Sequence, residues 1–138
     1  MRQSFNKIKT SAEVQQKLTI LKASNRTKLT PNLILRIAFC HSLNIPSPPK
    51  PEDYDQEGSE FNRYTLTGEY DSLFSALLKQ RLVEDGLDPE ADFVEYFRGH
   101  LNRGVLEIYS RFKKIEDISL FFDRDIQKQI KEIVINDD

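Results

Sequence analysis

Residues 5–43 read FNKIKTSAEVQQKLTILKASNRTKLTPNLILRIAFCHSL and carry most of the positive charge that no nearby acid balances. The first 50 residues contain nine Lys or Arg and one acid, whereas residues 51–138 contain eleven Lys or Arg and 21 acids. The net charge of −2 therefore conceals a basic N-terminal part and an acidic remainder. Such an asymmetry within one chain favours a polyanionic partner.

A first helix is expected over residues 11–25. Thr10, followed three residues later by Glu13, has the spacing of a capping box, which marks the start of a helix. The apolar residues of this segment recur at helical spacing and would form one buried stripe: Val14, Leu18 and Leu21. A short extended segment is expected before this helix, over residues 6–11.

A second helix is expected over residues 31–43, because Thr30 is a favourable N-cap and Pro31 suits the first helical position. Its apolar residues face more than one side, so the helix lies either at the centre of a core or between partner subunits. The residues expected at an oligomer interface are Leu33, Ile34, Ile37 and Phe39. Arg36 interrupts this apolar surface, either as an ion-paired or snorkelling side chain or as a phosphate contact.

The segment 44–60 is expected to be an exposed, semi-extended loop. Its four prolines are incompatible with a regular helix, and five acids make it strongly polar. A proline-rich segment can also be a ligand for an SH3-type domain, although a plain connector is the simpler interpretation.

A third helix is expected over residues 68–85, with Thr67 as its N-cap and Gly86 as its C-terminal cap. Its expected buried face comprises Tyr70, Leu73, Phe74, Leu77, Leu78 and Leu82. A further helix should follow Asp88 and Pro89, which fit the N-cap and first helical positions. Its glycines, Gly99 and Gly104, indicate a break or, more simply, close approach of another helix.

The pattern as a whole predicts an all-α protein: one compact helical domain over residues 1–138, with a short N-terminal extended segment. Residues 115–138 are expected to form a C-terminal helical extension ending in an acidic terminus. The lone Cys40 excludes an internal disulfide, and no apolar run reaches the length of a membrane span. We therefore expect a soluble cytoplasmic protein without a membrane partner.

Catalytic patterns are weak in this sequence. Cys40 and His41 are adjacent on a helix and so point about 100° apart, which argues against a nucleophile–base pair. His100, flanked by Arg98 and Arg103, is either a structural or interface histidine or part of an anion site. Phosphate-binding glycine loops and metal-ligand spacings are missing from the sequence. We expect a protein that is not an enzyme and that needs no cofactor or metal.

A nucleic-acid surface is the function that the charges favour. Basic side chains that neutralise phosphates bind in a salt-dependent way and with little sequence preference. The candidate DNA-contacting residues are Lys7, Lys9, Lys17, Lys22, Arg26 and Lys28. Alternatively, this cluster is a solvated face balanced by the acidic remainder of the chain. The order of strand, helix, turn and helix also permits a ribbon-helix-helix dimer whose strand enters a DNA groove.

Four segments resemble a known family in order and spacing: KIKTS, LTPNLILRIAFCHSLN, EFNRYTLTGEYDSLFSALLKQRL and RGHLNRGVLEIY. Together they span residues 6–112 and are similar to DndE, the small subunit of the bacterial DNA phosphorothioation (Dnd) system. The resemblance implies a compact helical protein that forms a homotetramer and binds double-stranded DNA, preferring nicks. It also implies that sulfur chemistry resides in partner subunits, a sulfurtransferase and an ATPase-like protein, and that the lysines of the strand and first helix face DNA.

Three hypotheses remain open at this point. The first is a non-enzymatic, oligomeric DNA-binding subunit of the phosphorothioation machinery. The second is an adaptor whose helix 31–43 docks the larger subunits while those subunits contact DNA. The third is a nuclease that uses His41 or His100 as a base.

Overall fold

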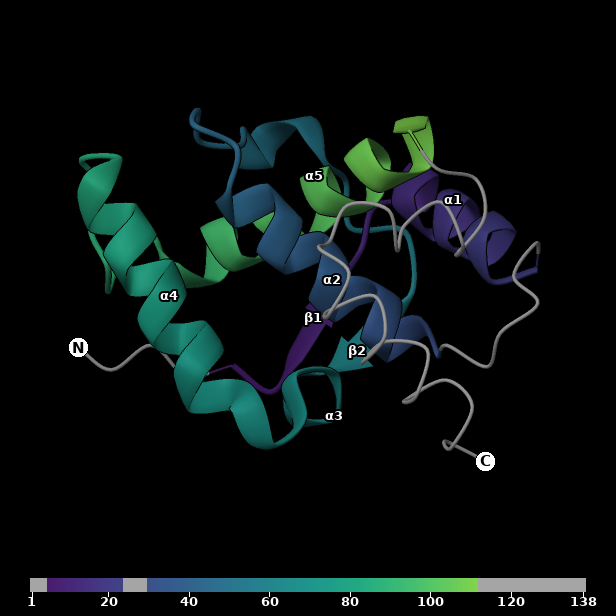
Figure 1. Ribbon diagram of the computed structural model, residues 1–138, viewed down its shortest axis with the longest axis horizontal. Coiled ribbons are helices and arrows are strands. Elements are labelled where there is room, and N and C mark those ends of the chain that lie inside the picture. The colour runs from purple at the N-terminus through teal and green to yellow at the C-terminus, as the bar shows by residue number, and fades with distance from the viewer. Residues whose placement is uncertain (1–4, 24–29, 112–138) are drawn as a thin grey trace, which may run out of the picture.

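The computed structural model describes residues 5–23 and 30–111. Its elements are β1 (Lys7–Lys9), α1 (Ala12–Ala23), α2 (Pro31–Leu43), η1 (Pro51–Asp53), β2 (Glu60–Asn62), α3 (Arg63–Thr67), η2 (Gly68–Tyr70), α4 (Asp71–Glu84) and α5 (Phe93–Arg111). The all-α class is confirmed, and the short extended segment is β1. The longest helix, α5, passes behind α2, with α4 and α1 at opposite ends of the molecule (Figure 1). The expected extension over residues 115–138 lies outside the described residues.

Helices α2 and α5 make the closest packing in the fold. A Cβ atom at Gly104 would overlap the carbonyl oxygen of Ala38, so only glycine permits this approach of the two backbones. Gly99 faces the Pro49 ring instead, where a Cβ would lie 3.2 Å from the nearest ring carbon. The expected close approach of another helix is confirmed at Gly104, whereas at Gly99 the neighbours are the prolines Pro49 and Pro51 of the segment 44–59.

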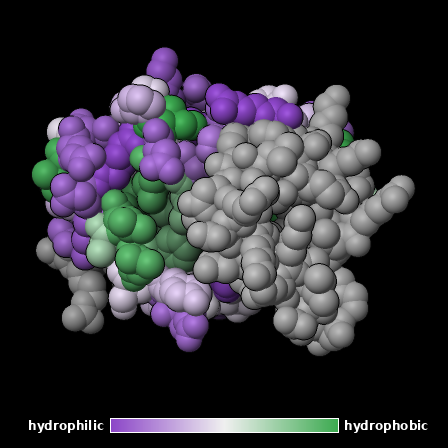
Figure 2. All heavy atoms as spheres, viewed as in Figure 1, coloured by the Kyte–Doolittle hydropathy of each residue, from purple (hydrophilic) through white to green (hydrophobic). Residues whose placement is uncertain are grey.

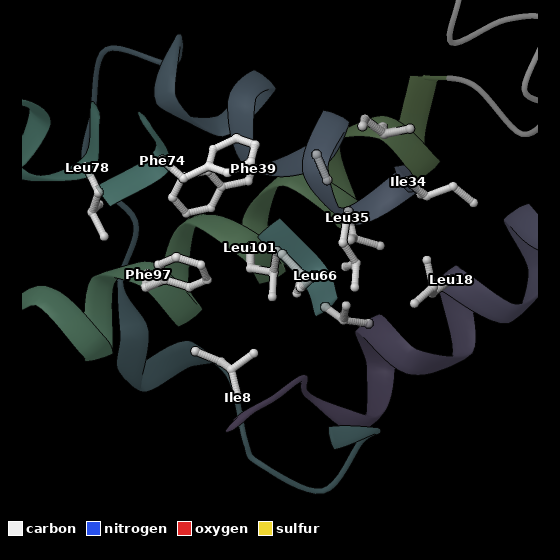
Figure 3. Packing of buried hydrophobic residues seen from close by; sticks show 14 of the residues in the cluster. Ile8, Leu18, Ile34, Leu35, Phe39, Leu66, Phe74, Leu78, Phe97 and Leu101 are labelled. Atoms are coloured by element: carbon white, nitrogen blue, oxygen red, sulfur yellow. The ribbon is translucent and has the colours of Figure 1, made fainter. Parts of the chain in front are cut away.

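The core is one cluster to which β1 and all the longer helices contribute, and Figure 3 shows its central part. Phe39 of α2 lies between two aromatic side chains, with its ring centroid 4.8 Å from that of Phe97 and 5.7 Å from that of Phe74. The apolar stripe expected on α1 is confirmed, because Val14, Leu18 and Leu21 are all buried. Helix α2 has the predicted bounds and starts at the predicted cap, since the Thr30 hydroxyl accepts a hydrogen bond from the Leu33 amide.

The start of α1 differs from the expected capping box. Ser11, rather than Thr10, caps the helix, because its hydroxyl accepts from the Val14 amide at 3.0 Å. The Ser11 amide donates to the Asn102 side chain on α5 at 2.8 Å. The Thr10 hydroxyl is used elsewhere, since it accepts from the Ser59 amide. Tertiary contacts therefore move the cap by one residue.

The third helix, expected over residues 68–85, is observed as η2 followed by α4, and the short helix α3 precedes it. Gly68 adopts a φ of +61°, which interrupts the helix, and the Thr67 hydroxyl lies near the Arg63 carbonyl instead of capping. Only Phe74, Leu78 and Leu82 of the expected apolar face are buried. Tyr70, Leu73 and Leu77 are 49%, 54% and 42% exposed, so this part of the expected face was wrong. Gly86 has the positive φ of a C-terminal cap, as expected.

The segment 44–59 is not the free connector that its composition suggested. Pro49 and Pro51 are buried, and three arginines from α4 and α5 donate hydrogen bonds to carbonyl groups of this segment or of Leu43, which precedes it: Arg81, Arg98 and Arg103. Its acidic side chains do remain mostly exposed. The loop is therefore held to the domain through its backbone.

Candidate nucleic-acid interface

The strand β1 carries the first two candidate lysines. It pairs antiparallel with β2, with Lys7 opposite Asn62, Ile8 opposite Phe61 and Lys9 opposite Glu60. Because side chains alternate along a strand, Ile8 enters the core while Lys7 and Lys9 are both exposed. The Lys7 amine lies 3.7 Å from the Glu60 carboxylate, an exposed pair that adds little stability.

Lys17 and Lys22 lie on different flanks of α1. The Lys17 amine lies 4.7 Å from the centroid of the Tyr109 ring, a cation–π contact that directs it towards α5. Lys22 is exposed in the last turn of α1, where it lines a groove of about 570 Å³. This groove runs between α1 and β2 and includes Leu18, Glu60 and Phe61.

A second hollow, of about 250 Å³, lies beside the strand lysines. Its lining combines bases and acids: Lys7, Ile8, Lys9, Gln56, Glu60, Val94, Glu95 and Arg98. The charge near β1 is therefore partly balanced by the protein itself. Among the described residues that line the groove beside Lys22, Glu60 is the one acid. The remaining two candidates, Arg26 and Lys28, lie outside the described residues.

Three arginines that could have contacted phosphate are used inside the protein. Arg36 donates to the backbone carbonyls of Thr65 and Leu66, so its role is structural, although its partners are carbonyl groups rather than the acid of the expected ion pair. Arg98 donates to the carbonyls of Pro51 and Tyr54, at 3.1 and 3.0 Å. The Arg103 guanidinium contacts the Ser42 hydroxyl and carbonyl and the Ser47 carbonyl.

Two further buried arginines were missed by the sequence analysis. Arg63 forms a two-pronged pair with Asp71 and lies 4.5 Å over the Phe5 ring, while Arg81 pairs with Asp85 at 2.8 Å. Nothing in the sequence distinguishes them from surface residues, because a charged residue on an amphipathic helix is normally exposed. Arg63 therefore joins α3 to side chains of α4, whereas Arg81 also donates to the backbone carbonyls of Leu43, Pro46 and Ser47.

His100 is a buried structural histidine. Its Nδ1 atom lies 2.9 Å from the Ser42 hydroxyl oxygen, and no hydrogen-bond partner reaches its Nε2 atom from the part of the chain that the structure describes. Burial, with smaller contributions from the positive charges of Arg103 and Arg81, lowers the pKa of His100 to about 3. The imidazole is therefore neutral near neutral pH. Burial and Arg111 also lower the pKa of His41.

The four residues of α2 that were expected at an oligomer interface differ in their exposure. Leu33 and Ile37 are partly buried and lie at the edge of the core. Ile34 and Phe39 are only 1% and 2% exposed within the single chain, so they have no surface to offer a second copy. For these two residues the expectation requires correction, because their side chains are buried in the core that α2 forms with α1, α4 and α5.

An apolar surface that the sequence did not reveal begins at the end of η2 and continues along α4. Tyr70, Leu73 and Leu77 follow one another at helical spacing on its solvent side, and Figure 2 shows apolar surface in the region of α4. Within residues 5–23 and 30–111, His, Cys, Asp and Glu form no group that could hold a metal ion. Over the same residues, none of the helices has the length and apolar character required to cross a bilayer.

Comparison with known proteins shows which structures this fold is similar to and which family the chain matches. The crystal structure of DndE from Escherichia coli B7A, a protein involved in DNA phosphorothioation modification, matches with a TM-score of 0.59 and 23% identity. A glycine-to-lysine mutant of DndE matches with a TM-score of 0.59 and 22% identity, and each alignment covers 78% of this chain and 99% of the other. No curated protein matches the chain. The family model for the DNA sulphur modification protein DndE matches residues 7–116, and the chain therefore belongs to the DndE family.

Proposed function

We propose that this chain is the DNA-contacting subunit of a phosphorothioation system and that it binds duplex or nicked DNA through its N-terminal basic surface. This surface comprises Lys7, Lys9, Lys17, Lys22, Arg26 and Lys28. The observation that supports the proposal most directly is that the arginines and the lysines of the chain have different surroundings. The arginines of α2, α4 and α5 described above donate to the chain's own backbone, whereas Lys7, Lys9 and Lys22 are exposed and Lys17 is half-buried with its amine over the Tyr109 ring.

The role of these lysines would be electrostatic. Lys9 and Lys22 project from elements packed on one core, so their positions are set before DNA arrives. Each phosphate that they neutralise releases condensed counterions, and this gives affinity without sequence selectivity. The chain would act as a binding subunit in the cytoplasm, and its partner subunits would perform the sulfur chemistry.

Assembly into a homo-oligomer, with a tetramer as the proposed state, would multiply these contacts. One subunit offers only a few phosphate contacts, whereas several subunits on one duplex add theirs together. Leu33 and Ile37 are the members of the original interface set that retain exposed surface for such an assembly.

The test is a salt titration of binding to intact and nicked duplex, followed by fluorescence anisotropy. The double variant Lys17→Gln, Lys22→Gln should bind more weakly at every salt concentration. The slope of log K against log salt should fall in magnitude by about 1 for each lysine removed. The matched control, Lys50→Gln with Lys79→Gln, removes the same charge from exposed positions elsewhere and should bind like the wild type. If both double variants lost the same DNA affinity, the effect would be one of net charge, and this result would contradict binding through a local surface.

An adaptor that docks a larger subunit of the system is the second candidate function. The exposed apolar residues of α4 support it. If α4 is the docking surface, Leu73→Asp should abolish capture of the partner subunit while DNA binding by the isolated chain is retained. The lysine double variant would show the opposite pattern under the first proposal.

A further inference from the structure

An exposed aromatic side chain lies at the end of the ribbon formed by β1 and β2. Among the residues that the structure describes, the exposed aromatic side chains are Tyr64 and Tyr70, at 51% and 49%. Tyr64 belongs to α3, which begins directly after β2 (Figure 1). Aromatic rings contribute most to stability when they are buried. A ring that the fold holds half in water is therefore available to a ligand.

The Tyr64 ring is fixed by a buried cation. The Arg63 guanidinium lies 5.2 Å from the centroid of the Tyr64 ring and 4.5 Å from that of the Phe5 ring. This guanidinium is itself held, because it donates to both Asp71 carboxylate oxygens, at 3.0 and 3.2 Å, and to the Ser75 hydroxyl at 3.0 Å. One side of the Tyr64 ring therefore rests on a cation that the protein keeps in place.

The start of α3 places Tyr64 on the lysine side of the ribbon. Lys7 and Asn62 are opposite residues of the antiparallel pair, and the side chains of such residues lie on the same face. The Asn62 side chain accepts hydrogen bonds from the Tyr64 amide at 2.9 Å and from the Thr65 amide at 3.1 Å. Tyr64 is therefore held close to the face of the ribbon from which Lys7 and Lys9 project.

An aromatic ring beside cations has the two parts of a surface that binds unpaired nucleotides. The cations neutralise phosphates, and a base stacks its π face on the ring. Within a continuous duplex each base is stacked on its neighbours, and taking it out of the stack costs free energy. In a gap or a single strand the face of a base is already free. Tyr64 would therefore add affinity only where the DNA carries an unpaired base.

We propose that Tyr64 stacks on an unpaired base while Lys7 and Lys9 contact phosphates of the same strand. Since this contact belongs to the DNA surface proposed above, it rests on that proposed function. The lysines supply affinity for any DNA, and Tyr64 selects DNA in which one strand is interrupted by a gap. Stacking neutralises no phosphate, so the contribution of Tyr64 does not depend on salt.

The test measures binding to a continuous duplex and to the same duplex with a short single-stranded gap, by fluorescence anisotropy. Tyr64→Ala should lose about fivefold or more of its affinity for the gapped DNA and less than about twofold for the continuous duplex. Its slope of log K against log salt should equal that of the wild type. Tyr64→Phe keeps an aromatic ring and should bind both DNAs like the wild type.

Tyr70→Ala is the matched control, because it removes the same side chain at nearly the same exposure from outside the ribbon. It should leave both affinities of the isolated chain unchanged. Equal losses on the two DNAs, equal losses in the two alanine variants, or no loss in Tyr64→Ala would overturn the stacking role. These outcomes leave the proposed function intact as long as the wild type binds DNA in a salt-dependent way. A wild-type chain that bound neither DNA would refute the proposed function itself.

A second measurement uses the unaltered sequence. Iodouracil replaces a thymine opposite the gap, and irradiation of the complex joins it to an aromatic side chain that stacks on it. The expected adduct lies on the peptide that contains Tyr64, and an adduct on another residue, or none, contradicts the proposal. Light scattering should give Tyr64→Ala the same mass as the wild type. A smaller mass would show that Tyr64 is a contact between copies and would refute its role in stacking.

Discussion

Gly104 of α5 packs so closely on α2 that the carbonyl oxygen of Ala38 occupies the place of a Cβ atom. Gly104→Ala should therefore destabilise the protein by about 2 kcal/mol or more, because two backbones must separate. Alanine is the better helix former by about 1 kcal/mol, so the steric effect acts against propensity. Urea unfolding measures the difference. At Gly99 the nearest atom is a proline ring carbon at 3.2 Å, so Gly99→Ala is the control and should cost clearly less.

His100 should make the folded state sensitive to mild acid. Its pKa is about 3 when folded and about 6.5 when unfolded, so the unfolded state takes up the proton first. Its contribution is fully present above pH 6.5 and is lost progressively as the pH falls towards 3. The complete shift corresponds to about 4 to 5 kcal/mol. Urea unfolding at pH 7, 6 and 5 should show a shallower dependence for His100→Gln than for the wild type, and parallel curves would refute this assignment.

Arg81 should be essential for the position of the segment 44–59. Its guanidinium donates to the carbonyls of Leu43, Pro46 and Ser47 and to the Asp85 carboxylate. Replacement by Met would leave these acceptors without a donor and should cost about 3 kcal/mol. Amide hydrogen exchange should accelerate in residues 44–50. Lys7→Met, at an exposed ion pair, is the control and should change stability by well under 1 kcal/mol.

The N-terminal cap of α1 allows a test between the observed cap, Ser11, and the capping box that the sequence pattern predicted. Ser11→Ala should cost about 1 kcal/mol, because the Val14 amide loses its acceptor. Glu13→Ala should cost clearly less than Ser11→Ala, since Glu13 does not complete a capping box with Thr10. Thermal or urea unfolding of both variants tests this pair. A larger loss in Glu13→Ala than in Ser11→Ala would indicate that the capping box does form.

The sequence predicted what depends on local chemistry. The bounds of α2 follow from Thr30 and Pro31, and the cap at Gly86 follows from the freedom of glycine at positive φ. The DndE resemblance was also visible in the order of four segments, and the family match agrees with it.

What depends on distant contacts was not predictable. A helical wheel cannot determine that Leu73 faces solvent while Leu78 faces the core, because this depends on which side α5 packs. Arg81 and Arg63 resemble surface residues until the carbonyls and carboxylates around them are in place. Within the candidate interface, the sequence identified the lysines, but only the fold shows that Lys17 turns to Tyr109 while Lys22 opens on a groove.

The hydrogen bond from the Ser11 amide to Asn102 joins residues 91 positions apart. During synthesis, α1 and the basic strand leave the ribosome long before β2 and α5 exist to hold them. Closing so long a loop has an entropic cost that only the later contacts repay. The proposed DNA surface is therefore assembled last in time although it comes first in the chain, and an incomplete nascent chain would not yet present it.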